Sequence, residues 1–241
     1  MKLEFPSGFL PVSHVIFDLD GTLLDTEKLY REALYYVSSL YDKDCTNEIV
    51  LKIAGTPQPI TAKIAIEELE LPITNDTFLG LYNGYIHEKL GDCDLMPGAK
   101  QIIKHFHESN VPMAVATSSN KKSVQIKTRK HKAIFQHMEH FVCGDSDPEV
   151  KNGKPAPDIF LVCASRFSSK PRPSECLVFE DSLNGVKAGI AAGMQVVMVP
   201  EPHVPIEYGN YATLRIESFE QLDLQYFGLP SVSFDIINEH F

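Results

Sequence analysis

Residues 12–22 read VSHVIFDLDGT, and the interpretation of the whole chain begins there. The apolar run stops at Asp18, and Gly21 permits a tight turn soon after, so the stretch predicts a short buried strand. Asp18 and Asp20 are two positions apart, and near-extended backbone turns side chains at that spacing to one side. Two close carboxylates are stable only when a cation lies between them or one holds a proton. With Gly21 and Thr22 behind it, this acidic pair favours catalysis over a helix-capping turn.

Short apolar runs recur after this strand and are separated by stretches with helical spacing. The runs cover residues 112–117, 141–143, 176–179 and 195–199. The helical stretches lie near 97–109, 120–132, 156–167 and 182–192. Strands that alternate with helices predict an α/β fold, a Rossmann-like doubly wound parallel sheet with helices on both faces. Ligands of such sheets bind outside the carboxyl ends of the strands, so the residues just after each run are the candidates for a site.

Residues 26–92 interrupt this alternation with a pattern that is helical throughout. Apolar residues such as Leu29 and Ala33 recur at helical spacing, and Asp25 is a suitable cap for the first helix. The sequence therefore predicts an α/β core domain with an inserted α-helical cap domain. The predicted bounds are 1–25 and 93–241 for the core and 26–92 for the cap.

The bulk composition argues against several classes of protein. With 44% apolar and 22% charged residues, the chain is typical of a soluble globular protein and not of a disordered one. Its net charge of -10 argues against a nucleic-acid partner, although a local pocket can still bind a small anion. No apolar stretch approaches the roughly 18 residues of a membrane span, and the first residues lack the apolar region of a signal peptide. We therefore expect neither nucleic acid nor membrane as a partner.

The cysteines and the lysine-rich stretch have ordinary interpretations. The five cysteines are scattered and odd in number, which predicts neither a disulfide framework nor a zinc site and suits a cytoplasmic location. Basic residues gather between positions 121 and 132, and a charge run of this kind is expected to be a solvated helix face.

Three further strand ends carry polar residues suited to phosphoryl transfer. Thr117 and Ser118 could cradle an anion with a hydroxyl and a backbone amide, or could merely cap the next helix. Lys154 is a compact cation suited to phosphate, or else a surface lysine. Glu180 and Asp181 offer hard oxygen ligands for Mg²⁺, or a helix cap. Four such groups in order, each at a strand end, indicate one phosphoryl-transfer site.

This set resembles the haloacid dehalogenase superfamily of phosphatases over nearly the whole chain. The resemblance is carried by DLDGT (18–22), Thr117 in AVATSS, Lys154 in KNGKPAPDIF, and ED (180–181) in VFEDSLNGVKAGIAAGM. The forms KPAPDIF and FEDSLNG, with a helical insertion before MPGA, are similar to the subgroup with a small helical cap. The resemblance implies that the cap closes over the site and selects the leaving group.

The resemblance also implies a role for each candidate residue. Asp18 would be the nucleophile, and Asp20 the general acid and then the general base. The cofactor Mg²⁺ would be held by Asp18, the backbone carbonyl of Asp20, and Asp181, with Glu180 in support. The residues expected to bind the transferring phosphate are Thr117, Ser118 through its amide, and Lys154.

The expected substrate is a small phosphorylated metabolite, a nucleoside or sugar monophosphate. Residues 116–135 and 144–167 are similar to family members that hydrolyse pseudouridine 5′-monophosphate, which makes that ester the first expectation. The cap loop AGTPQ (54–58) lacks the arginine with which mutase-type caps grip a second phosphate, which favours hydrolysis. A phosphosugar phosphatase and a β-phosphoglucomutase-like mutase stay open as alternatives. A catalytically idle binding protein is disfavoured because the catalytic motifs are complete. We expect a monomer or weak dimer.

Overall fold

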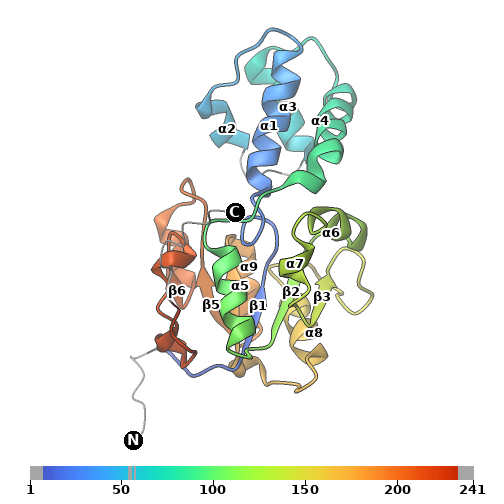
Figure 1. Ribbon diagram of the computed structural model, residues 1–241. Coiled ribbons are helices and arrows are strands. Elements are labelled where there is room, and N and C mark those ends of the chain that lie inside the picture. Colours follow the sequence, from blue (N-terminus) through green and yellow to red (C-terminus); the bar gives the residue numbers. More distant parts are fainter. Residues whose placement is uncertain (1–7, 54–55, 57, 233–241) are drawn as a thin grey trace, which may run out of the picture. The chain divides into compact units, whose positions relative to one another are not determined.

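The computed structural model describes residues 8–53, 56 and 58–232. A six-stranded sheet with the order β3-β2-β1-β4-β5-β6 forms the middle layer of one compact unit, residues 1–24 and 95–241 (Figure 1), and every strand pair is parallel. The strands are β1 (His14–Phe17), β2 (Met113–Thr117), β3 (His140–Cys143), β4 (Cys176–Glu180), β5 (Gln195–Met198) and β6 (Leu214–Arg215). The chain extends the sheet in both directions from β1, as in doubly wound folds, so the predicted fold class is confirmed.

Helices lie on both faces of this sheet. They are α5 (Ala99–Glu108), α6 (Lys121–Lys127), α7 (Lys132–Phe135), α8 (Asp158–Arg166) and α9 (Leu183–Ala191), with the 3-10 turns η2 (Pro173–Glu175), η3 (Ile206–Tyr211), η4 (Phe219–Gln221) and η5 (Leu224–Phe227). Successive side chains of β1 point to opposite faces. Val15 and Phe17 join the apolar cluster that includes α5, and Ile16 joins the one that includes α8 and α9. Since both faces are covered, the strands read as continuous apolar runs.

Two local features differ from the sequence prediction. The single helix expected over 120–132 is two helices, because Thr128 ends α6. The Thr128 hydroxyl donates to the Val124 carbonyl at 2.8 Å, a local bond of the kind that competes with a continuing helix. The strand β6 was not predicted, since two residues are too few to form a recognisable apolar run.

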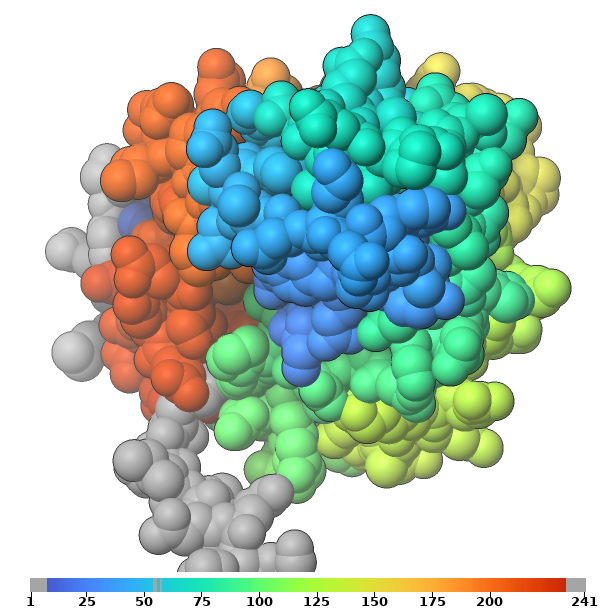
Figure 2. All heavy atoms as spheres, turned by 90° about the horizontal axis from the view of Figure 1, so that it is seen from above, coloured from blue at the N-terminus to red at the C-terminus, as the bar shows by residue number. Residues whose placement is uncertain are grey.

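Residues 25–94 form a second compact unit, separate from the unit that contains the sheet. Its helices are α1 (Thr26–Ser39), α2 (Asn47–Ile53), α3 (Gln58–Leu69) and α4 (Asn75–Lys89), followed by the 3-10 turn η1 (Leu90–Asp92). As predicted, Asp25 caps α1 by accepting from the Lys28 amide at 3.0 Å. Figure 2 shows one face of this unit, with α1 in blue and the later helices in light blue to turquoise. The predicted cap segment 26–92 lies within it, but positions 54, 55 and 57 of the cap loop lie outside the described residues.

Two further observations concern the whole described chain. All five cysteines are buried and none forms a disulfide with another described residue, so Cys143, Cys163 and Cys176 are small core residues, as their apolar surroundings predict. Within residues 8–53, 56 and 58–232, no helix combines the length and apolar character needed to cross a membrane.

Candidate active site

The central strands β1, β2 and β4 are neighbours in the sheet. At the same edge, each of them ends in a polar residue or is directly followed by one. Asp18 directly follows β1, and its amide donates to the Phe179 carbonyl of β4 at 2.9 Å. Thr117 is the last residue of β2, and Glu180 is the last residue of β4. The parallel register therefore brings these three predicted residues to one edge, the edge at which such sheets bind their ligands.

Lys154 reaches this edge from the loop before α8 and forms a buried ion cluster there. Its ammonium donates to Asp18 Oδ1 at 2.5 Å, to Glu180 Oε1 at 2.6 Å and to the Ala116 carbonyl at 3.3 Å. The side chains of Lys154, Asp18 and Glu180 are only 7%, 8% and 1% exposed, so each charge depends on its partners for compensation. Burial alone would lower the pKa of Lys154, but the carboxylates of Asp18 and Glu180 outweigh it and raise that pKa above its ordinary value.

Negative charge is in excess at this edge. Burial raises the pKa of Asp18 to about 7, and the nearby carboxylates of Glu180 and Asp20 add to the rise while Lys154 opposes it. Burial also raises the pKa of Asp181 well above its ordinary value, with Glu180 and Asp18 as the next causes. Three carboxylates face one ammonium here, so the edge would be stabilised by a further cation.

Two glycines leave room for the acidic side chains, and a serine orients one of them. A Cβ at Gly21, whose φ is +81°, would lie 2.4 Å from Asp181 Oδ2, and a Cβ at Gly185 would overlap the Glu180 carboxylate. Ser182 donates to Glu180 Oε2 at 3.0 Å from both its amide and its hydroxyl. With Lys154 on its other oxygen, Glu180 is occupied by protein donors, which suits the supporting role predicted for it.

Asp20 contacts a separate set of partners. Its Oδ2 accepts from the Ser119 hydroxyl at 2.9 Å and from the Thr117 hydroxyl at 3.3 Å, and its Oδ1 accepts from the Lys127 ammonium at 2.5 Å. The expectation that the basic run is a solvated face is wrong for Lys127, which is 3% exposed because its charge is paired with Asp20. Lys127 follows Val124 by three residues, so the sequence places both on one side of a helix. Ser119 lies within the AVATSS motif, but the sequence predicts no separate role for its hydroxyl.

Ser118 is the predicted residue with the fewest contacts. It is exposed in the turn after β2, where the turn lies against Gly144. A Cβ at Gly144 would be 3.4 Å from the Thr117 carbonyl and 3.6 Å from Ser118 Cα. The Gly144 amide donates to that carbonyl at 2.8 Å, which ties the loop after β3 to the Thr117 turn.

The donor set at the carboxylate edge fits a magnesium ion in its chemistry. Within the described part of the chain, no group of three or more His, Cys, Asp or Glu side chains is arranged to hold a metal ion. A divalent ion would therefore be held by fewer side chains, with a backbone carbonyl and water completing its shell, as is usual for Mg²⁺. The raised pKa values of Asp18 and Asp181 are the observation that favours a cation at this place.

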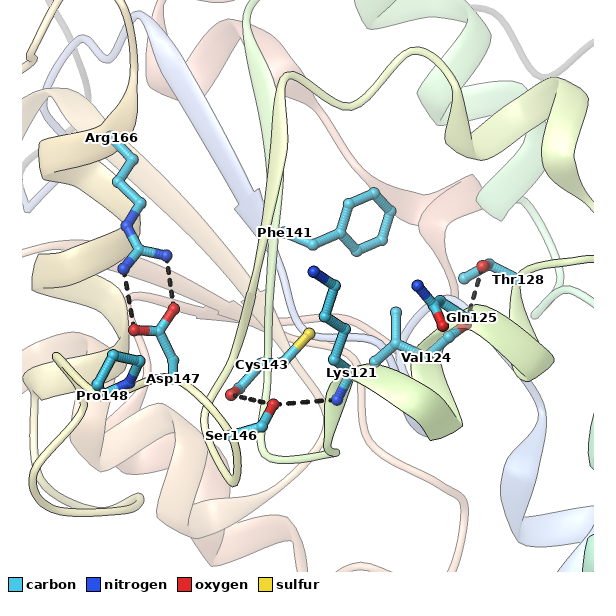
Figure 3. Close-up of a pocket in the computed structure, with 10 residues that line it drawn as sticks. All are labelled: Lys121, Val124, Gln125, Thr128, Phe141, Cys143, Ser146, Asp147, Pro148 and Arg166. Atoms are coloured by element: carbon cyan, nitrogen blue, oxygen red, sulfur yellow. Dashed lines mark hydrogen bonds and ion pairs between the residues drawn. The ribbon is translucent and has the colours of Figure 1, made fainter.

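A cavity of about 500 Å³ has a different set of lining residues, which come from α6, β3, the loop after β3 and α8 (Figure 3). Its lining includes Val124 of α6, Phe141 and Cys143 of β3, and Arg166 of α8. Arg166 is held by Asp147 through bonds of 2.5 and 2.9 Å. None of the residues predicted for phosphoryl transfer lines this cavity.

Known proteins resemble the chain over most of its length. A family model of haloacid dehalogenase-like hydrolases matches residues 12–193. The chain is 44% identical to a probable pseudouridine-5′-phosphatase of Drosophila melanogaster, over 91% of this chain and 95% of that protein. It is 40% identical to (DL)-glycerol-3-phosphatase 2 of Arabidopsis thaliana, over 91% and 92% of the two chains. The solved structure of a putative β-phosphoglucomutase from Thermotoga maritima superposes with a TM-score of 0.71 at 28% identity, covering 85% of this chain and 94% of that one.

Proposed function

Because the chain belongs to the haloacid dehalogenase-like hydrolases and is a phosphoric monoester hydrolase, we propose that it hydrolyses a small phosphate monoester through a phosphorylated Asp18. The observation that carries this proposal is the buried contact of Asp18 with Lys154 at the end of β1. A cation beside the attacking carboxylate would favour its ionised form and would also attract the phosphate oxygens. Asp20 lies two residues further on, with Thr117 and Lys127 as its partners.

The proposed reaction consists of two successive displacements at phosphorus. Asp18 would attack phosphorus while the ester P–O bond breaks, and the leaving oxygen would take the proton of Asp20. Asp20, now a carboxylate, would remove a proton from water, and that water would displace the Asp18 carboxylate from phosphorus. Lys154 and the Thr117 turn would orient the phosphate, since positioning and charge neutralisation supply most of the rate in phosphoryl transfer.

The proposal includes Mg²⁺ as the cofactor, held by Asp18, Asp181 and the backbone carbonyl of Asp20, with Glu180 supporting Lys154. When bound, the ion would neutralise negative charge on the phosphate oxygens. The excess of carboxylates over ammonium groups at this edge supports the assignment.

For the substrate we propose pseudouridine 5′-monophosphate first. The support is the 44% identity to a probable pseudouridine-5′-phosphatase along nearly the whole of both chains. Glycerol 3-phosphate is a second candidate, given the 40% identity to a glycerol-3-phosphatase. A phosphosugar mutase is a third, given the likeness to a putative β-phosphoglucomutase. We further propose a cytoplasmic location, which the absence of disulfides among the described cysteines supports.

One assay separates these candidates. Phosphate release would be measured on pseudouridine 5′-monophosphate, uridine 5′-monophosphate, glycerol 3-phosphate and glucose 1-phosphate, each with Mg²⁺ and with EDTA. We expect release to be fastest from pseudouridine 5′-monophosphate and to stop in EDTA until Mg²⁺ is restored. Conversion of glucose 1-phosphate to an isomer without phosphate release would identify a mutase instead. Unchanged activity in EDTA would refute the metal assignment.

A further inference from the structure

Lys127 differs from the other lysines of its helix. Lys121 and Lys122 at the start of α6 are exposed, whereas the side chain of Lys127 at its end is 4% exposed. A buried ammonium is unfavourable unless a carboxylate and further hydrogen bonds compensate it. Among the described residues, the carboxylate that forms an ion pair with Lys127 is that of Asp20.

The contacts around Asp20 form a closed arrangement. The Lys127 ammonium donates to Asp20 Oδ1 at 2.5 Å and to the Ser119 hydroxyl at 2.9 Å. Ser119 in turn donates to Asp20 Oδ2 at 2.9 Å. Both carboxylate oxygens therefore accept hydrogen bonds, and because Lys127 and Ser119 also bind each other, the three groups restrict rotation of the carboxylate together. We call Lys127 and Ser119 the Asp20 clamp.

The clamp is held by a firmly anchored helix. The Asn120 side chain accepts from the Ser123 amide at 2.9 Å and so caps α6. The Ser146 hydroxyl accepts from the Lys121 amide at 3.1 Å, a bond visible in Figure 3. These bonds set where α6 begins and hence where the Lys127 ammonium lies.

Exposure is distributed unequally within the ion pair. The Asp20 side chain is 25% exposed, whereas that of Lys127 is 4% exposed. Part of the Asp20 side chain is therefore open to a reactant, whereas the ammonium that binds it is shielded from water. A purely structural ion pair would not need this asymmetry, and an apolar side chain in place of Lys127 would fill the same space without burying a charge.

We propose that Lys127, together with Ser119, is a positioning residue that orients the Asp20 carboxyl group for proton transfer. In the first displacement the proton of Asp20 goes to the leaving oxygen as its bond to phosphorus breaks; in the second, Asp20 takes a proton from water. The clamp sets the direction of both transfers and does not itself contact the reacting atoms. This inference rests on the proposed function.

The experiment compares Lys127→Met with the matched control Lys122→Met, an exposed lysine of the same helix. Each variant is assayed for phosphate release from an alkyl phosphate and from p-nitrophenyl phosphate, whose leaving group needs little protonation. General acid–base catalysis contributes about 10²- to 10⁴-fold, so loss of orientation should lower kcat on the alkyl ester by about 10- to 100-fold. We expect KM to change little, the loss on p-nitrophenyl phosphate to be several-fold smaller, and Lys122→Met to behave like the wild type.

A double-mutant cycle separates positioning from a general effect on folding. If Lys127 acts through Asp20, then Lys127→Met should add less than about a twofold loss in an Asp20→Asn background. An equal loss in both backgrounds, or equal losses on the two esters, would overturn the proposal. Should Lys127→Met fail to fold, Ser119→Ala is tested in the same cycle with the same expectations.

Different results would refute the proposed function and the Asp20 clamp. A wild-type enzyme that releases no phosphate from any ester would refute the proposed function. An active wild type in which Lys127→Met matches Lys122→Met in every assay would refute the clamp and leave the proposed function standing.

Discussion

The amino and carboxyl ends of the parallel strands form two edges of the sheet, and these carry buried or half-buried ionisable groups that differ in charge. At the amino edge, β1 begins with His14 and β3 begins with His140, and both rings meet Phe167 edge-on at centroid distances of 4.7 and 4.8 Å. Burial lowers the pKa of both histidines, so they are favoured as neutral rings. At the carboxyl edge the same sheet gathers Asp18, Glu180 and Asp181, and their charges are only partly balanced.

The difference shows which edge is organised for folding and which for chemistry. His14 and His140 reach hydroxyl or carbonyl partners, and neither edge-on ring adds a buried charge. Three carboxylates around one lysine are a less stable arrangement than an apolar one of the same volume would be. A protein that keeps such a cluster at the edge where doubly wound sheets bind ligands has a functional reason for it.

The largest effect on activity is expected from Asp18→Asn. Loss of the proposed nucleophile should reduce phosphate release by about 10⁴-fold or more. In metal-free protein at pH 7 the variant should be no less stable than the wild type, because it removes one of the crowded carboxylates. Phosphate-release assays and chemical unfolding in EDTA would check both parts. Substantial remaining activity would show that the carboxyl edge owes its function to another group.

Lys154→Met should affect both activity and stability. Breaking a buried ion pair by removing one partner costs about 3–5 kcal/mol, since Asp18 and Glu180 would lie buried without their cation. Loss of the cation that we propose binds the phosphate should also reduce kcat/KM by about 10²-fold or more. Urea unfolding at pH 7 and at pH 5 gives a control: the deficit should shrink at the lower pH, where the carboxylates accept protons more readily. A deficit that is equal at both pH values would contradict the electrostatic explanation.

Gly185→Ala tests the carboxyl edge without changing a charge. The added Cβ would overlap the Glu180 carboxylate and displace it from Lys154, which should cost about 1–3 kcal/mol and reduce turnover about tenfold. Gly153→Ala is the matched control, because no heavy atom lies within 4 Å of its added Cβ. If the two alanine variants were equally active and equally stable, the placement of Glu180 would not matter to the site.

The smallest effect concerns the amino edge and is a pH dependence of stability. The folded state holds His14 and His140 at pKa values below the ordinary 6.5, so below about that pH the unfolded chain binds more protons than the folded one. The two neutral rings therefore contribute to the free energy of unfolding above the ordinary pKa, and this contribution is lost as pH falls from there through the lowered pKa of the folded state. The free energy of unfolding should therefore decline from pH 7 to pH 5 less steeply in His14→Asn than in the wild type. A steeper decline in the variant would contradict a neutral His14.

The sheet and the four strand-end motifs could be predicted because they depend on local patterns. Buried strands leave continuous apolar runs, and parallel order brings the residues that follow them, such as Asp18 and Glu180, to one edge. The end of α6 at Thr128 was not predicted, because the apolar periodicity does not reveal it.

Lys127 and Ser119 could not be predicted for a different reason. Lys127 stands in a lysine-rich stretch, where burial of one member depends on a partner that is 107 positions away in the chain. Only the folded sheet, which places β1 beside β2, brings Asp20 to that helix. Ser119 is the last residue of the AVATSS motif, yet nothing in that motif indicates that its hydroxyl binds Asp20.

The most direct test of the central claim is to trap the phosphorylated enzyme. The wild-type protein would be mixed with a reactive phosphate ester and Mg²⁺, quenched in acid during turnover, and treated with borohydride, which reduces an acyl phosphate to an alcohol. Mass spectrometry of the peptides should then find the reduced side chain at position 18 and nowhere else. Turnover without any trapped group, or a phosphoryl group on another residue, would contradict the assignment of Asp18 as the nucleophile.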